Sequence, residues 1–168
     1  MAHLWSGRFD TDPDPDVFSY GVSLSFDRHL FEDDVTGSLA WAEALANAGV
    51  LTAEAAGAID GALRDILETS RHDPTRVVGP DEDVHAFVER QLIERIGEAG
   101  QRLHTGRSRN EQVSLDLRLY FKRRIPRLIA RLRRLVTALA DQAQASALQT
   151  MPSYTHLRRA QPILVAHF

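Results

Sequence analysis

Apolar residues recur every three to four positions over most of the chain, the spacing that gathers side chains on one face of an α-helix. In the first such stretch Phe31, Val35 and Leu39 begin a stripe that continues through Ala42 and Leu45. A second stripe consists of Val84, Val88, Leu92 and Ile96. These stripes predict helices over 27–47, 53–69 and 81–96, and a much longer one that follows a loop at 97–106.

The longest stripe runs from Val113 to Leu139, at a period of roughly 3.5–3.6 residues. A helix of this length needs partner helices along it, so we expect a bundle core or an oligomer interface. Pro126 lies inside the pattern and should kink the helix.

Proline and glycine separate the predicted helices. Residues 1–22 read as an irregular arm, because Pro13 and Pro15 argue against a helix at 12–16. Gly49 is a plausible helix stop, and Thr52 a cap for the next helix. Residues 151–162 break the long helix, and we expect a further helix to begin at Pro162.

This pattern predicts an all-α fold, with an N-terminal helical domain and arm over 1–108 and the start of a long-helix bundle over 109–168. A content of 43% hydrophobic and 26% charged residues is typical of globular chains. The net charge of −3 argues against a nucleic-acid partner, and no apolar run is long enough for a membrane span. The absence of cysteine excludes disulfides and fits the reducing cytoplasm.

The segment 103–112 is the richest in reactive groups. Arg107 and Arg109 offer two guanidinium groups, next to the polar side chains of Ser108 and Asn110. Such groups together bind a carboxylate. Ser108 and Glu111 also have the spacing of a capping box, so this segment could simply begin a helix. We favour an anion site over a cap alone. Arg107 and Arg109 lie at a helix N-terminus, where positive charge is disfavoured, and residues that break such a local rule often lie at functional sites.

Other candidates allow a structural interpretation. Asp81, Asp83, His85 and Glu89 could bind a metal, but we favour helix-terminal charges and a surface His85–Glu89 pair, and so predict no metal. Seven basic residues lie between 122 and 134, and such a run is more often a solvated face than a nucleic-acid site. Ser23 and its neighbours could simply cap a helix.

His156 lies in a predicted turn beside Thr155 and two arginines. Imidazole suits a general acid or base because it titrates near neutral pH. A lone histidine is more often structural, so the residue by itself indicates little.

Taken together, several segments resemble the argininosuccinate lyase family of the fumarase/aspartase superfamily. The most specific is His-Thr-Gly-Arg-Ser-Arg-Asn at 104–110. The others, in matching order, are 4–9, 23–30, 81–85 and 151–162.

The resemblance implies elimination of argininosuccinate to arginine and fumarate, as a step of arginine biosynthesis, without cofactor or metal. It implies a cytoplasmic homotetramer built on long helices, with active sites shared by three subunits. His156 would be the catalytic acid or base. The substrate would be bound by Ser23, Ser108, Arg109, Asn110 and Thr155.

Three features depart from the family pattern. Glu111 replaces the usual Asp, and Ser153 and Arg158 replace the usual Gly and Gln around Thr155 and His156. The serine-bearing loop Gly-Ser-Ser-x-Met-Pro is not in the sequence, so we expect an incomplete, N-terminal part of the enzyme. The alternative is a non-catalytic structural or assembly protein of the same descent.

Overall fold

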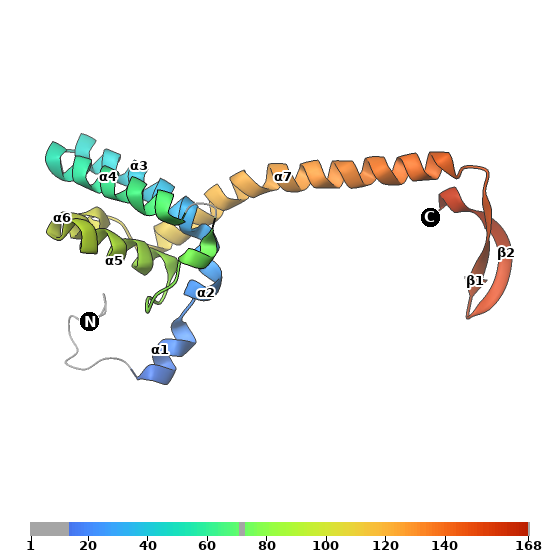
Figure 1. Ribbon diagram of the computed structural model, residues 1–168, viewed down its shortest axis with the longest axis horizontal. Coiled ribbons are helices and arrows are strands. Elements are labelled where there is room, and N and C mark those ends of the chain that lie inside the picture. Colours follow the sequence, from blue (N-terminus) through green and yellow to red (C-terminus); the bar gives the residue numbers. More distant parts are fainter. Residues whose placement is uncertain (1–13, 71–72, 168) are drawn as a thin grey trace. The chain divides into compact units, whose positions relative to one another are not determined.

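The computed structural model describes residues 14–70 and 73–167. These residues are mostly helical, which confirms the all-α class, apart from one small two-stranded sheet (Figure 1). None of the helices described is long and apolar enough to cross a membrane. The chain divides into two compact units, 1–120 and 121–168. The boundary predicted after residue 108 stays a prediction, since the long helix belongs to both units.

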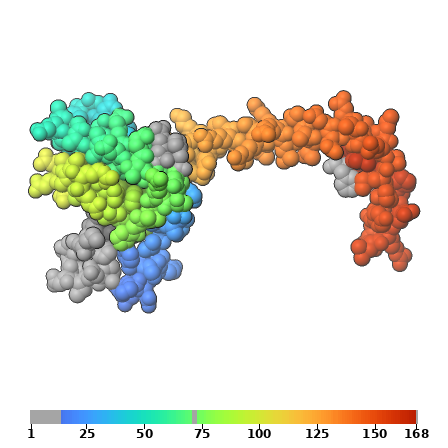
Figure 2. All heavy atoms as spheres, viewed as in Figure 1, coloured from blue at the N-terminus to red at the C-terminus, as the bar shows by residue number. Residues whose placement is uncertain are grey.

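The first unit holds a cluster of helices that pack side against side. In chain order its elements, with η for 3₁₀ helices, are α1 (Pro15–Gly21), α2 (Leu24–Asp27), η1 (Arg28–Leu30), α3 (Phe31–Asn47), α4 (Ala53–Ser70), η2 (Pro74–Arg76), α5 (Val84–Ile96), α6 (Glu98–Gln101), η3 (Arg102–His104) and the start of α7 (Arg109–Ala145). The space-filling view shows the side chains of α3–α6, cyan to yellow-green, in mutual contact (Figure 2).

The core of this unit is made by the predicted stripes. Val35 of α3, Ile59 and Leu63 of α4, and Leu92 of α5 are each completely buried. The Thr52 hydroxyl accepts the Ala55 N–H at 3.2 Å, as expected of a cap, and Gly49 has the left-handed φ of 71° that favours glycine. Periodicity therefore predicted the inward faces of α3, α4 and α5 correctly.

The expectation of an irregular arm through residue 22 is wrong for its second part, where residues 15–21 form α1. Pro15 occupies the first turn, where a helix N–H has no intrahelical partner to lose. The Asp14 carboxylate accepts the N–H groups of Asp16 and Val17, at 2.9 and 3.4 Å. The motif at 4–9 lies outside the described residues.

The second unit contains the rest of α7 and a hairpin. The helix continues through Pro126 to Ala145. It is followed by the antiparallel strands β1 (Thr150–Thr155) and β2 (Arg158–Leu164), and by η4 (Val165–His167). The helix expected from Pro162 is therefore wrong. Pro162 lies opposite Pro152 in the register, and proline can begin a helix or occupy an edge strand equally well.

Candidate active site

Ser23 lies just before α2 and is bonded to the segment that precedes α5. The N–H groups of Ser23 and Leu24 both donate to the Glu82 carbonyl, at 2.7 and 3.1 Å. The Ser23 hydroxyl donates to the Asp27 carboxylate, whose other oxygen accepts the Val84 N–H at 3.1 Å. Asp27 therefore accepts the first N–H of α5. Burial raises the pKa of Asp27, and the hydrogen bond from Ser23 opposes that rise.

Arg109, the first residue of α7, is held by the same segment. Asp83 caps α5 by accepting the Ala86 N–H at 2.6 Å, and its second oxygen lies 3.0 Å from Arg109 Nε. Arg109 Nη1 donates to Gln112 at 3.3 Å, whereas Nη2 is buried without a hydrogen-bond partner among the residues described. Nε, although 3.0 Å from Asp83, makes no hydrogen bond either, so two guanidinium nitrogens remain for an acceptor that the described chain does not supply.

Ser108 and Asn110 form the N-terminal cap of α7. The Ser108 N–H donates to Glu111 Oε2 at 2.6 Å, and Ser108 Oγ accepts the Asn110 N–H at 3.2 Å. The capping box is therefore present, while both side chains stay exposed. They line a depression of about 410 Å³ that also includes Arg118. A cap and a polar surface for a ligand coexist here.

Thr155 and His156 belong to the second unit. Thr155 ends β1 and pairs with Arg158, which leaves His156 and Leu157 as the two-residue turn of the hairpin. Both turn residues have positive φ, 50° and 63°, a conformation that non-glycine residues rarely adopt. His156 is thus presented at an exposed, strained turn. Four of the six predicted residues lie in the first unit and two in the second, so neither unit contains the whole predicted site.

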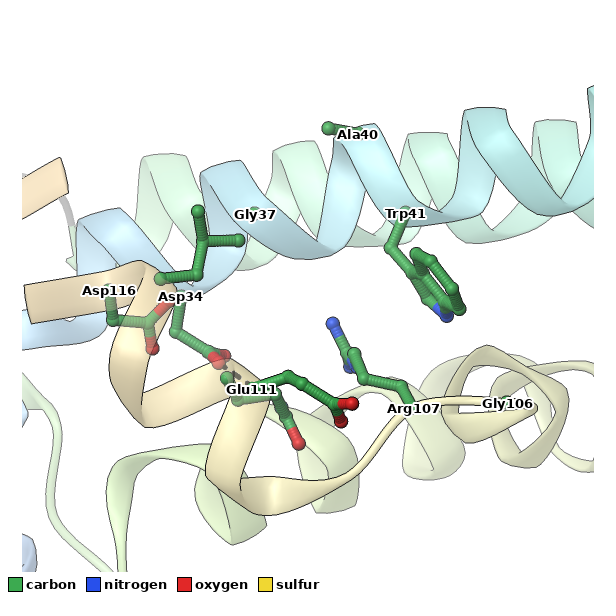
Figure 3. A pocket seen from close by; sticks show the side chains of 10 residues that line it. Asp34, Gly37, Ala40, Trp41, Gly106, Arg107, Glu111 and Asp116 are labelled. Carbon is green, nitrogen blue, oxygen red and sulfur yellow. Dashed lines mark hydrogen bonds between the residues drawn. The ribbon is translucent and has the colours of Figure 1, made fainter. Parts of the chain in front are cut away.

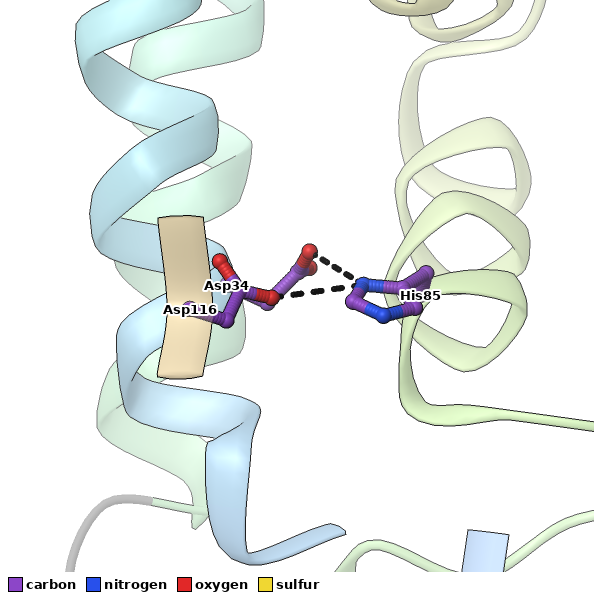
Figure 4. A group of neighbouring side chains, drawn as sticks. All are labelled: Asp34, His85 and Asp116. Carbon is purple, nitrogen blue, oxygen red and sulfur yellow. Dashed lines mark hydrogen bonds and ion pairs between the residues drawn. The ribbon is translucent and has the colours of Figure 1, made fainter. Parts of the chain in front are cut away.

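The structure also reveals a buried group that the sequence analysis missed. His85 is only 3% exposed, so the predicted surface pair with Glu89 is wrong. Its Nδ1 lies 2.7 Å from Asp34 Oδ1 and 3.4 Å from Asp116 Oδ2 (Figure 4). Donor atoms of the three residues lie within 4.8 Å of one another, close enough to share one ion. The signal for this group in the sequence was weak: Gln112 and Asp116 lie four positions apart and so share one face of the helix.

A pocket of about 360 Å³ adjoins this group, between α3 and the first turns of α7. Asp34 and Trp41 project from α3 toward Arg107 and α7 (Figure 3). Arg107 donates to Ser38 Oγ at 3.1 Å, and burial lowers the pKa of its guanidinium. None of the six predicted site residues lines this pocket. Arg107 therefore contributes to the interior of the unit, whereas Arg109 contacts the segment before α5.

Comparison with known protein families gives a match over most of the chain. The family model described as lyase matches residues 7–168, which is nearly all of the 168-residue chain. The chain therefore belongs to this lyase family, within the fumarase/aspartase superfamily.

Proposed function

Starting from this membership, we propose that the protein eliminates fumarate from argininosuccinate. The observation that supports the proposal most is the junction of three motif segments in the first unit. The Ser23 amide is bonded to Glu82, and Arg109 pairs with Asp83. The motif segments 23–30, 81–85 and 103–112 therefore meet in the first unit, and this contact supports a substrate site shared by them.

The reaction removes a proton from the carbon next to a succinyl carboxylate and breaks the bond from the neighbouring carbon to the guanidinium nitrogen. The electron pair of the C–H bond becomes the double bond of fumarate, and the departing nitrogen is protonated to give arginine. His156 acts as an acid or base in these proton transfers. Arg109 and Asn110 donate hydrogen bonds to the carboxylate, on which negative charge builds up. Ser23, Ser108 and Thr155 complete the set of substrate contacts.

Because neither unit holds all six residues, we propose that the site is completed when copies associate through α7, as a homotetramer in the cytoplasm. Apolar side chains of α7 in the second unit are about half exposed, among them Leu128 at 56%, Leu132 at 51% and Leu135 at 55%. Exposed apolar stripes of this size are typical of association surfaces. Sedimentation of the purified protein measures the association state directly.

The function is tested by fumarate release, followed by its ultraviolet absorbance. The assay uses the 168-residue chain and the same chain continued by the downstream bundle of an active family member. Argininosuccinate should release fumarate, whereas malate and aspartate, the substrates of other superfamily branches, should not react. His156→Asn should abolish turnover, and His167→Asn, an exposed histidine of the same unit outside the turn, should not.

Turnover of aspartate or malate in place of argininosuccinate would keep the lyase chemistry and overturn the substrate. Turnover unaffected by His156→Asn would overturn the assigned role of His156. No turnover in either form, with association through α7 intact, would favour the alternative of a non-catalytic assembly protein.

A further inference from the structure

The buried group formed by Asp34, His85 and Asp116 joins three helices at one point. Asp34 comes from α3, His85 from α5 and Asp116 from α7 (Figure 4). Asp34 Oδ1 also accepts a hydrogen bond from Gln112 Nε2 at 3.3 Å, so α7 contributes two residues, one turn apart. Asp34 is 2% exposed and Asp116 1%, so solvent does not screen either carboxyl.

In the part of the chain described, each of the two carboxyl groups has one oxygen atom that accepts no hydrogen bond. Asp34 Oδ2 and Asp116 Oδ2 are buried and have no hydrogen-bond partner among the described residues. Two carboxylates this close cannot both stay ionised in a buried site, and a single proton between them removes the repulsion and supplies the missing donor. Burial, followed by the neighbouring Asp34, raises the pKa of Asp116 to about 9, in agreement with a carboxyl that keeps its proton at neutral pH.

Other charged groups around the pair come from every neighbouring element. Asp33 of α3 adds negative charge near Asp116. Arg107, from the loop before α7, is attracted by Asp34 and Asp116, and also by Glu89 of α5. With one shared proton the pair carries a single negative charge, which the guanidinium of Arg107 balances. A divalent cation would instead be placed beside that buried guanidinium, so a proton fits the site better than a metal.

The cluster is connected directly to the predicted substrate residues. His85 follows Asp83 by two residues, and Asp83 pairs with Arg109 at 3.0 Å. Gln112, which binds Asp34, also accepts a hydrogen bond from Arg109 Nη1. A displacement of α7 at Asp116 would therefore move the turn that carries Arg109 and its neighbours.

We propose that Asp116 is a positioning residue: it shares one proton with Asp34, beside His85, and so fixes the first turn of α7, with Ser108, Arg109 and Asn110, against α3 and α5. The geometry of the cluster stands by itself, whereas its consequence for catalysis rests on the proposed function. The test therefore needs one measurement that does not depend on turnover.

That measurement is hydrogen exchange of the amides of Glu111 and Gln112, expressed as protection relative to the unstructured chain at each pH. Both amides donate to the Ser108 carbonyl, at 3.1 and 3.2 Å. In the unaltered protein, protection should fall at least tenfold as pH rises from 7 to 10. Asp116→Asn, which imitates the protonated carboxyl, should keep protection across this range, and Asp116→Ala should lose it throughout.

Asp60→Asn is the matched control, because Asp60 is a half-exposed helical aspartate on α4 that pairs with Arg64. It should leave the pH dependence of protection unchanged. The proposal is overturned if Asp116→Ala retains full protection, or if Asp116→Asn shows the same fall with pH as the unaltered protein. It is also overturned if Zn²⁺ or Mn²⁺ binds with unit stoichiometry and Asp116→Asn removes that binding.

Turnover provides the second arm. Asp116→Ala should raise KM for argininosuccinate at least tenfold, Asp116→Asn should restore it, and the alkaline loss of kcat/KM should disappear in Asp116→Asn. If no variant turns over substrate while the exchange results hold, the proposed function fails and the positioning of the α7 turn survives. If turnover is normal but Asp116→Ala changes neither KM nor protection, the positioning role fails alone.

Discussion

The two ends of α7 differ in which of their side chains are buried within their own unit. In the first unit, Gln112 and Asp116 are buried at 4% and 1%, while Val113 and Leu117 are 38% and 40% exposed. In the second unit the apolar side chains remain exposed, and Leu139, at 60%, is an example. The same apolar spacing thus continues along a helix that buries polar side chains in the first unit and leaves its apolar side chains exposed in the second.

The difference shows what amphipathic spacing does and does not specify. The period fixes which residues share a helix face, because 3.6 residues complete a turn. It does not fix which face meets a neighbouring helix of the same unit. Polar groups can be buried where the rest of the fold brings partners to them: Gln112 donates to Asp34, and Asp116 lies 3.4 Å from His85 and close to Asp34, with which it can share a proton.

The largest expected effect comes from removing a core side chain of the first unit and comparing it with the exposed stripe. Leu63 is completely buried, so Leu63→Ala should lower the free energy of unfolding by about 2–5 kcal/mol. Leu132→Ala, at a position 51% exposed, should change it by less than about 1 kcal/mol in a dilute monomer. Urea denaturation followed by circular dichroism measures both.

Equal losses for the two leucines at low protein concentration would contradict the comparison, since Leu132 would then be packed within its own unit. A loss for Leu132→Ala that grows with protein concentration would instead support association through the stripe.

The next effect concerns pH. The pKa of Asp116 is raised to about 9 in the folded protein from an ordinary value of 3.8. Between these values the folded chain keeps a proton that the unfolded chain releases. The free energy of unfolding should therefore fall as pH rises from about 4 to 9, by up to about 1.4 kcal/mol per pH unit, and then level off. The raised pKa of Asp27 acts in the same direction.

Denaturation at a series of pH values measures this slope. Asp116→Asn should make the slope shallower, because the amide cannot release a proton. An identical slope in the variant would mean that a group other than Asp116 keeps the proton in the folded protein.

A smaller effect is expected at the N-terminus of α4. Thr52→Ala removes the hydroxyl that accepts the Ala55 N–H and should cost about 1 kcal/mol of stability. Thr69→Ala is its control, because the Thr69 hydroxyl donates back to the Asp65 carbonyl at the other end of the same helix. In thermal denaturation, Thr52→Ala should have a lower melting temperature than Thr69→Ala. The reverse order would contradict the capping role.

The smallest effect is expected at an exposed ion pair. Arg64 Nε lies 2.7 Å from Asp60, but their side chains are 65% and 47% exposed. Water and salt screen such a pair, so Asp60→Asn should leave the melting temperature within experimental error. A clear drop would mean that the surface of α4 is covered by a partner.

Much of the fold was determined by local sequence. The stripes of α3, α4 and α5, the cap at Thr52 and the stop at Gly49 were predicted, because each depends on residues within one or two helical turns. The capping box of Ser108 and Glu111 was recognised for the same reason. The resemblance to argininosuccinate lyases also came from short motifs, and the match over residues 7–168 confirmed its broader part, the lyase family of the fumarase/aspartase superfamily.

Only the tertiary structure decided the features that join distant segments. Asp34, His85 and Asp116 are separated by 51 and 31 positions, and no local pattern predicts that their side chains meet. Pro162 was compatible with the start of a helix or with an edge strand, and it lies in a strand whose partner places Pro152 opposite it. The helical pattern alone does not determine whether a polar side chain is buried or exposed. Its burial is favourable only if the rest of the fold brings suitable partners to it.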